Sequence, residues 1–137
     1  MVDTVNTTAR SKDYSDFDLA FRSNAVTADL TLKKGAESVK QSVLNILLTN
    51  SGERPFMSAF GGNVRAFLFE NFDAVTEDLI EENIRTALRN YEPRVRVLEC
   101  VVDANEDNNR INVRLEIEIL SPAQTTTTVE FTVERQR

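Results

Sequence analysis

The side chains of this sequence that could catalyse a reaction are carboxylates. The 137 residues include 22 Asp and Glu, one Cys and no His. Without histidine, the usual general base near neutral pH and the imidazole ligands of a metal are missing. Two carboxyl groups roughly 5 to 10 Å apart could hydrolyse a glycosidic bond, but among so many acids such a pair arises by chance. The acids from Glu77 to Glu82 have the spacing of a solvated helix face, and Glu116 and Glu118 that of the exposed side of a strand.

Other functional classes lack their usual residues. Gly61-Gly62 has neither the spacing nor the following lysine of a phosphate-binding loop. Sixteen basic residues leave a net charge of −6, which argues against nucleic-acid binding. The first residues lack the basic start and the apolar stretch of a signal peptide, so we expect none, and no apolar run approaches the ~20 residues of a membrane span. Cys100 lies in an apolar run, which indicates a buried thiol in a protein of a reducing compartment. We therefore expect no cofactor, no metal, no nucleic acid and no membrane partner.

The triplet Glu92-Pro93-Arg94 follows an apolar helical pattern. Proline directly after a helix is a common stop signal, so the triplet is readily explained as a terminator with two surface charges. Alternatively, a rigid turn presents Arg94, together with Glu92, to a partner, because a planar guanidinium pairs with carboxylates or carbonyls through two hydrogen bonds. The residues alone leave both interpretations open.

A loop precedes this helix and holds three of the four glycines of the chain. We expect its aromatic residues, Phe56 and Phe60, to pack in the core. The residues that define it are Gly52, Glu53, Arg54, Pro55, Phe56, Phe60 and Gly61.

Helical periodicity predicts three helices that would position these segments. One runs from about Ala36 to Leu48 and one from about Thr76 to Tyr91, with Thr76 as its cap. A short helix over Val64 to Asn71 would bury Phe67 and Leu68 or Phe69. Pro93 ends the last helix.

The remainder is predicted to be β structure. Val95 to Asp103 is apolar with a change of phase that indicates a bulge, placing Val95 and Val97 on one face and Leu98, Cys100 and Val102 on the other. A turn over Asn105 to Asn109 leads to two strands with strict alternation. Their apolar residues are Ile111, Val113, Leu115, Ile117 and Ile119, then Val129, Phe131 and Val133.

The C-terminal strand, Thr125 to Arg137, begins with four threonines. It is either an ordinary edge strand protected by the charges of Glu130, Glu134 and Arg135 or a strand that pairs with another chain. Both interpretations remain open on composition.

Residues 1–13 are predicted to be a flexible arm and residues 14–137 a single domain. In the segment Tyr14 to Phe21, Phe17, Leu19 and Phe21 alternate with small or polar residues, so one face should lie on the core. Asn24 to Gly35 is expected to be a loop with an extended piece near Leu30 and Leu32. The predicted fold is α+β: two main helices and a short one packed on a small, mainly antiparallel sheet with a C-terminal strand meander.

Several spaced motifs resemble the baseplate-wedge and sheath-initiator family of contractile-tailed bacteriophages, whose relatives occur in type VI secretion baseplates. The resemblance runs from about Tyr14 to Leu120 and is strongest to the T4-like branch. The motifs are Gly52-Glu53-Arg54-Pro55-Phe56, Phe60-Gly61, Leu68-Phe69-Glu70-Asn71, Asn83-Ile84 through Ala87, and Arg89-Asn90-Tyr91-Glu92-Pro93-Arg94.

The resemblance implies a structural protein of the virion, assembled in the host cytoplasm and located in the tail baseplate. It implies that Glu92, Pro93 and Arg94 bind the core-bundle proteins of the wedge, with the tail tube as a neighbour. It also implies that the strands bearing Ile111 to Ile117 and Val129 to Val133 initiate the tail sheath by strand exchange. The family also carries an old lysozyme label, which these residues do not support. The alternatives are a carboxylate-dependent peptidoglycan hydrolase and a regulatory protein-binding module of the same fold.

Overall fold

The computed structural model describes residues 15–18, 20–105, 109–120 and 125–134. The chain divides into two compact units, one up to Ser38 and one from Val39 onward. The predicted arm over residues 1–13 lies outside the described residues, and the single domain over residues 14–137 stays a prediction.

The first unit is a small two-stranded antiparallel sheet. Strand β1, Ser15–Phe17, pairs with β2, Leu32–Lys34, and Phe17 lies opposite Leu32. The expected extended piece near Leu30 and Leu32 is present, because Leu30 also forms a bridge with Ser23. Phe17 and Phe21 are not buried within this unit, since their side chains are 57 % and 69 % exposed, and Leu19, the third residue of the predicted face, lies outside the described residues. Strand β1 ends at Phe17, and Phe21 has a φ of +48°, so the extended alternation does not reach it.

Helix α1, Ala36–Leu48, has the bounds that its periodicity predicts. Val39, Val43, Ile46 and Leu47 are buried along one stripe, at the helical spacing of three and four residues. After the helix, the Thr49 hydroxyl donates to the Asn45 carbonyl oxygen. The chain then turns into the glycine-rich loop.

Helix α2, Ala74–Tyr91, begins two residues earlier than predicted, and its cap is Asp73 rather than Thr76. The Asp73 carboxylate accepts a 2.8 Å hydrogen bond from the Thr76 backbone N–H. This bond holds the pKa of Asp73 below its usual value. Thr76 is the third residue inside the helix, and its hydroxyl donates to the Asn71 carbonyl oxygen instead. Asp and Thr are both good capping residues, so composition alone could not choose between the two positions.

The short helix before α2 is a 3₁₀ helix, η1, over Val64–Phe69. It buries Val64 and Leu68 and half-buries Phe67. Phe69, the other candidate for burial, is 71 % exposed. A short 3₁₀ helix can turn only one narrow side toward the core, because side chains three residues apart overlie each other.

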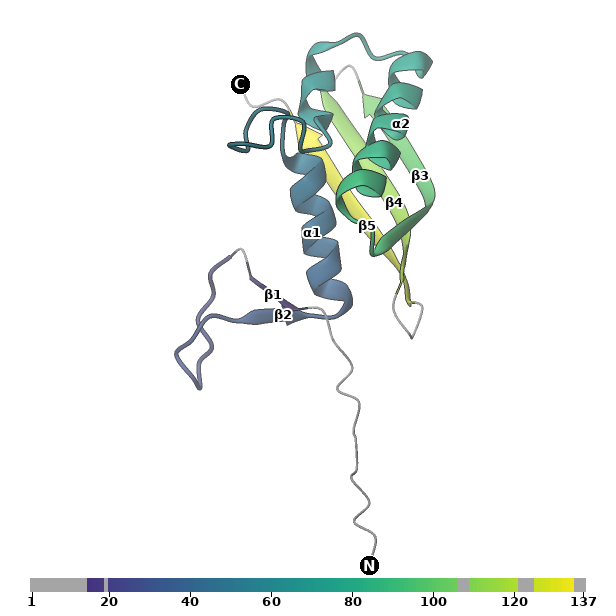
Figure 1. The fold of residues 1–137 in the computed structure, drawn as a ribbon. Helices are drawn as coiled ribbons and strands as arrows, with labels where there is room; N and C mark the ends of the chain where they lie inside the picture. Colours follow the sequence, from purple (N-terminus) through teal and green to yellow (C-terminus); the bar gives the residue numbers. More distant parts are fainter. Residues whose placement is uncertain (1–14, 19, 106–108, 121–124, 135–137) are drawn as a thin grey trace, which may run out of the picture. The chain divides into compact units, whose positions relative to one another are not determined.

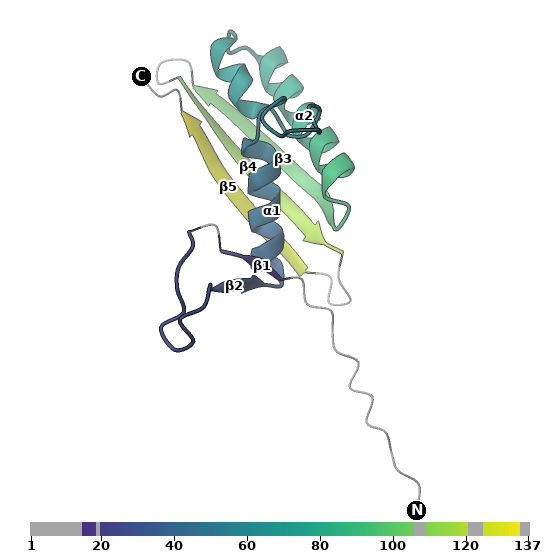
Figure 2. The ribbon, with the colours of Figure 1, turned by 60° about the vertical axis from the view of Figure 1, so that its left-hand side comes forward.

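Three antiparallel strands form the main sheet in the order β3-β4-β5. They span Val95–Asn105, Arg110–Ile119 and Thr125–Glu134. In the register, Leu115 of β4 lies opposite Cys100 and Val129. Helices α1 and α2 lie on the same face of this sheet (Figures 1 and 2). The core lies between helices and sheet, and the predicted α+β class with its C-terminal meander is confirmed.

The predicted bulge in β3 is confirmed, but its effect on the two faces differs from the prediction. The register shifts between Val97 and Glu99, at Leu98. The extra residue returns Cys100 to the same face as Val97, so Leu98 is 47 % exposed instead of facing inward. Cys100 is buried, as expected, and burial together with the charge of Glu81 raises its pKa to about 11. The thiol is therefore protonated and unreactive at neutral pH.

Candidate partner-binding site

The backbone leaves helix α2 at Glu92, where Pro93 prevents the helix from continuing. The Glu92 N–H still donates to the Leu88 carbonyl oxygen at 2.9 Å, but its φ of −133° and ψ of 72° are no longer helical. This geometry turns the Glu92 side chain inward, and only 2 % of the residue is exposed. The triplet therefore contains a buried carboxylate where the sequence suggested a surface charge.

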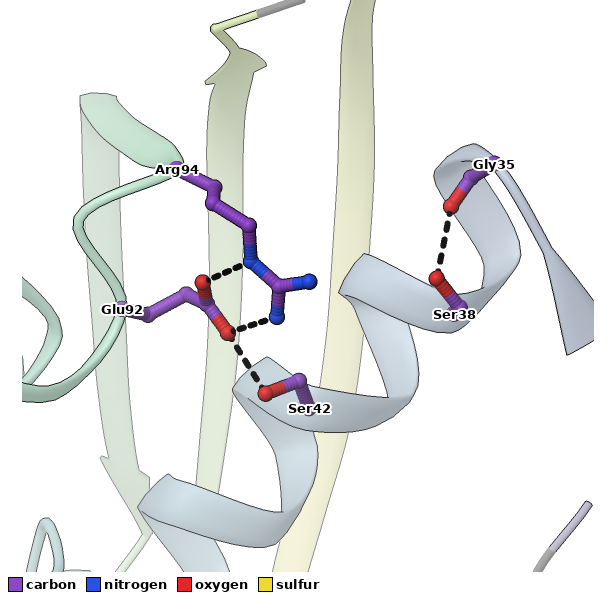
Figure 3. Close-up of polar contacts among 5 residues, drawn as sticks. All are labelled: Gly35, Ser38, Ser42, Glu92 and Arg94. Carbon is purple, nitrogen blue, oxygen red and sulfur yellow. Dashed lines mark hydrogen bonds and ion pairs between the residues drawn. The ribbon is translucent and has the colours of Figure 1, made fainter. Parts of the chain in front are cut away.

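Three hydrogen bonds hold the Glu92 carboxylate (Figure 3). Arg94 donates from Nε to Oε1 at 2.5 Å and from Nη2 to Oε2 at 2.6 Å. Ser42 of α1 donates its hydroxyl to Oε2 at 2.5 Å. The group thus ties the end of α2, the start of β3 and the middle of α1 together. We call these three residues the Glu92 lock.

The electrostatics of the Glu92 lock keep the carboxylate charged. Burial alone would favour the neutral form, but the hydrogen bonds from Arg94 and Ser42 and the positive charge of Arg94 outweigh it. The pKa of Glu92 is therefore held below its ordinary value. A buried carboxylate that stays ionised with a bidentate partner serves as a fixed support.

Pro93 and Arg94 form the outward side of the same turn. Pro93 is exposed, and about a third of the Arg94 side chain, 34 %, remains accessible. The Arg94 carbonyl oxygen accepts from the Leu120 N–H at 2.8 Å, which fixes the backbone of the turn against the end of β4. The structure thus brings the predicted triplet together: Glu92 is buried, Pro93 is exposed, and Arg94 is half-buried, with its guanidinium turned toward Glu92.

The glycine-rich loop lies against α1 and the end of α2. A Cβ on Gly61 would lie 2.2 Å from the Thr49 carbonyl oxygen, and Gly61 has a φ of +120°, so only glycine fits there. The rings of Phe60 and Tyr91 lie 4.8 Å apart, and the Tyr91 hydroxyl donates to the Ala59 carbonyl oxygen at 2.6 Å. These contacts tie the loop to the residue directly before Glu92.

The loop does not place both of its aromatic residues in the core, as predicted. Phe60 is half-buried against Tyr91, but Phe56 is fully exposed. Phe56 also has a φ of +64°, a left-handed conformation that a bulky residue rarely adopts.

The first turn of the loop is organised by Glu53. Its carboxylate accepts from the Asn50 N–H at 3.0 Å and from the Asn50 side-chain amide at 2.7 Å. These hydrogen bonds hold the pKa of Glu53 below its usual value. Arg54 stacks its guanidinium on the Phe60 ring at 4.5 Å, and Pro55 is exposed beside it.

The residues predicted for strand exchange are those that fill the core of the sheet. Phe131 is half-buried, and the others are buried: Ile111, Val113, Leu115, Ile117, Val129 and Val133. Their side chains are occupied, so a strand from another chain could use only backbone groups at a sheet edge.

The two edges of the sheet differ. At the β3 edge, the Glu77 carboxylate of α2 accepts from the Ala104 N–H at 3.0 Å, and the bulge at Leu98 interrupts the strand. Both features protect an edge from pairing. On the β5 edge, η1 lies near the strand's C-terminal end, where Leu68 and Phe69 line one groove with Val133. The first half of β5, from Thr125, is the edge that remains suited to pairing.

Sequence reasoning missed Ser42 and Glu77. Ser42 is a small polar residue within the apolar stripe of α1, a position where a hydroxyl needs a partner once it is buried. That pattern was a usable signal. Glu77 was assigned to a solvated helix face, and nothing in the sequence indicates its bond to β3.

Metal and membrane sites are not found in the part of the chain that the structure describes. No group of three or more His, Cys, Asp or Glu there could hold a metal ion. None of the described helices is long and apolar enough to cross a membrane.

Comparisons with known proteins agree on one family. A family model described as "Baseplate wedge protein gp25" matches residues 33–125. The baseplate wedge protein gp25 of Enterobacteria phage T4 is 36 % identical over 110 residues, which are 80 % of this chain and 83 % of that protein.

Solved structures share the fold at lower identity. A chain in the baseplate of the anti-feeding prophage has a TM-score of 0.69 at 22 % identity, covering 80 % of this chain and 87 % of that one. A Geobacter sulfurreducens protein named as a candidate tail lysozyme has a TM-score of 0.64 at 24 % identity, covering 74 % of this chain and 91 % of that one.

Proposed function

The chain belongs to the family of baseplate wedge protein gp25, and we propose that it is a structural wedge subunit of a contractile phage tail. Its place is the tail baseplate of the virion, assembled in the host cytoplasm. Its partners are the core-bundle proteins of the wedge and the tail-sheath protein, with the tail tube as a neighbour. The observation that carries this proposal is the Glu92 lock, which holds the exposed Pro93 and the partly accessible Arg94 in a fixed conformation.

The turn is the proposed contact with the wedge bundle. A rigid proline and an arginine that is already oriented lose little conformational entropy when a partner binds. The guanidinium suits carboxylates and carbonyl oxygens, which helix ends and acidic helix faces supply. Glu92 contributes indirectly, because it fixes the position of Arg94 from the buried side.

The affinity of Arg94→Ala for purified wedge-bundle proteins tests this contact. The variant leaves Glu92 with Ser42 as its remaining lock partner, so it also loses stability. Ser42→Ala is the matched control, because it weakens the same lock and keeps Arg94. We expect Arg94→Ala to bind at least tenfold more weakly and Ser42→Ala to bind as the wild type does. Equal binding by all three proteins would exclude the turn from the interface.

The second part of the proposal is that β5 receives or exchanges a strand with the first sheath subunit. Thr125 to Thr128 is uncharged and strongly β-prone, and β3, at the other edge, is protected by Glu77. Backbone hydrogen bonds between chains would transmit force during contraction without a covalent link.

Single prolines at Thr127 and Thr128 test the edge. In an edge strand, successive N–H groups point alternately to the paired strand and to the free edge, so one of the two prolines removes a free-edge donor. That variant should keep its stability, because it breaks no bond with β4, yet fail to support sheath growth on baseplates. Normal sheath assembly with both variants would refute strand exchange at β5.

Three of the described carboxylates are unsuited to the general-acid role that the hydrolase alternative requires. Glu53, Asp73 and Glu92 all have pKa values below the ordinary ones. A glycosidase acid needs a raised pKa, so none of these three can be the general acid. A turbidity assay on peptidoglycan, with the purified chain at high concentration, should show no lysis.

A further inference from the structure

The most exposed aromatic side chain of the second unit lies at the tip of the glycine-rich loop. Phe56 is fully exposed and has a φ of +64°, in the left-handed region that bulky residues rarely adopt. Its ring gains nothing from burial in the subunit, and its backbone conformation costs free energy. Neither core packing nor turn geometry accounts for phenylalanine at this position. Glycine or asparagine would be the usual choice for such a turn.

The loop holds this tip in one conformation. The Gly52 N–H donates to the Ser58 carbonyl oxygen at 2.9 Å, and the Met57 N–H donates to the Arg54 carbonyl oxygen at 3.2 Å. On one side Glu53 binds Asn50, and on the other the Ala59 carbonyl oxygen accepts from Tyr91. A protruding side chain on a braced loop is organised before a partner arrives, which lowers the entropy lost on binding.

Arg54 adds a charge beside the ring. Its guanidinium carbon lies 4.5 Å from the centre of the Phe60 ring, within the range of a cation–π contact. Such a contact is made with the ring and not through hydrogen bonds, so the N–H donors of the guanidinium stay suited to a carboxylate. Arginine and aromatic residues are also the types that contribute most to protein interfaces. A convex tip of this kind fits an apolar pocket with a carboxylate at its rim.

We propose that residues 54–56 are a second anchor for the wedge-bundle proteins, with Phe56 inserted in an apolar pocket and Arg54 facing a carboxylate at the pocket's rim. The loop is joined through Phe60 and Ala59 to Tyr91, the residue before Glu92. The tip and the Pro93-Arg94 turn are therefore mounted on the same end of α2. The inference rests on the proposed wedge function and adds to it a second contact and the chemistry of its pocket.

Phe56→Gly is the informative change. Glycine adopts a φ of +64° without strain, so the variant should unfold at the wild-type temperature or above it. Loss of the anchor should nevertheless weaken the affinity for purified wedge-bundle proteins at least tenfold, as expected for a central aromatic contact. The matched control is Phe21→Gly, which removes another exposed phenylalanine with positive φ, outside the residues matched by the family model. It should bind as the wild type does.

Isothermal titration of the full chain and its variants against the wedge-bundle proteins separates the outcomes. A weakened Phe56→Gly beside an unchanged Phe21→Gly supports the anchor. Equal affinities of Phe56→Gly and the wild type, with Arg94→Ala weakened, overturn the anchor and leave the proposed function standing. Equal weakening by both phenylalanine variants also overturns it, because any exposed ring would then contribute. No binding by the wild type overturns the proposed function itself.

Discussion

Replacing Glu92 with glutamine should destabilise the protein at neutral pH through the loss of one charge. The change keeps the shape of the side chain and one oxygen acceptor. It removes the negative charge of the carboxylate to which Arg94 and Ser42 donate their hydrogen bonds. Hydrogen bonds to a charged group contribute about 1.5 to 3 kcal/mol each, and removing one partner of a buried pair costs about 3 to 5 kcal/mol. Arg94 remains 34 % exposed and can be solvated after the change. We therefore expect a loss of about 2 to 4 kcal/mol, or roughly 10 °C in Tm.

The pH dependence gives the prediction its second test. The pKa of Glu92 is lowered in the folded protein. Its contribution to stability is therefore fully present above the unfolded pKa, about 4.3, and is lost as the pH falls through the lower, folded pKa. The glutamine variant has no such contribution at any pH. The gap in unfolding free energy between the two proteins should be constant near neutral pH and should narrow below about pH 4.

Urea unfolding monitored by circular dichroism between pH 3 and 8 measures this gap. Glu130→Gln is the matched control, because Glu130 also pairs with an arginine, Arg114, at 2.7 Å but on an exposed face. An exposed pair contributes about 0 to 1 kcal/mol, so this control should differ little from the wild type. A Glu92→Gln protein within about 1 kcal/mol of the wild type, or a gap that stays the same down to pH 3, would refute the account of the lock.

Three further predictions concern positions outside the lock. Gly61→Ala should lower the Tm sharply, because the added Cβ would lie 2.2 Å from the Thr49 carbonyl oxygen. Gly52→Ala has open space around the added Cβ and should lower the Tm less. An equal loss of Tm in both variants would contradict the loop geometry. Asp73→Ala should lower the Tm and Asp73→Ser should restore most of it, and the lowered pKa of Asp73 predicts that the alanine effect fades in acid. Cys100 should react with an alkylating reagent only slowly in the native protein and rapidly in denaturant, and fast native labelling would contradict its burial.

The periodic elements could be predicted from the sequence because one face of each is buried. Helix α1 has its predicted bounds, and the apolar residues from Ile111 to Ile119 are buried at every second position of β4, as predicted. The cap of α2 was misplaced by three residues because Asp73 and Thr76 are both capping types. In β3 the sequence showed that the phase changes but not which residue is the extra one, since Val97, Leu98 and Cys100 are all apolar.

The candidate site was predicted in part. The triplet at the end of α2 was found from Pro93 and from the resemblance to a family, but the burial of Glu92 depends on Ser42, which is 50 residues away in the chain. Local patterns do not encode such a contact. Phe56 was placed in the core because aromatic residues are usually buried, and only the folded loop shows that its side chain is fully exposed. Phe17 and Phe21 were also expected to be buried, but their side chains are exposed. An alternating pattern predicts a strand, but it does not show which surface the strand packs against.

The most direct test of the central claim, membership of the wedge as a structural subunit, is co-expression of the chain with the wedge-bundle proteins of the same phage. Size-exclusion chromatography with light scattering measures the mass of what elutes together. We expect a stoichiometric complex that forms with the wild type and Ser42→Ala and is lost or reduced with Arg94→Ala. A chain that elutes alone, at the mass of its free form, would contradict the claim that it binds the wedge.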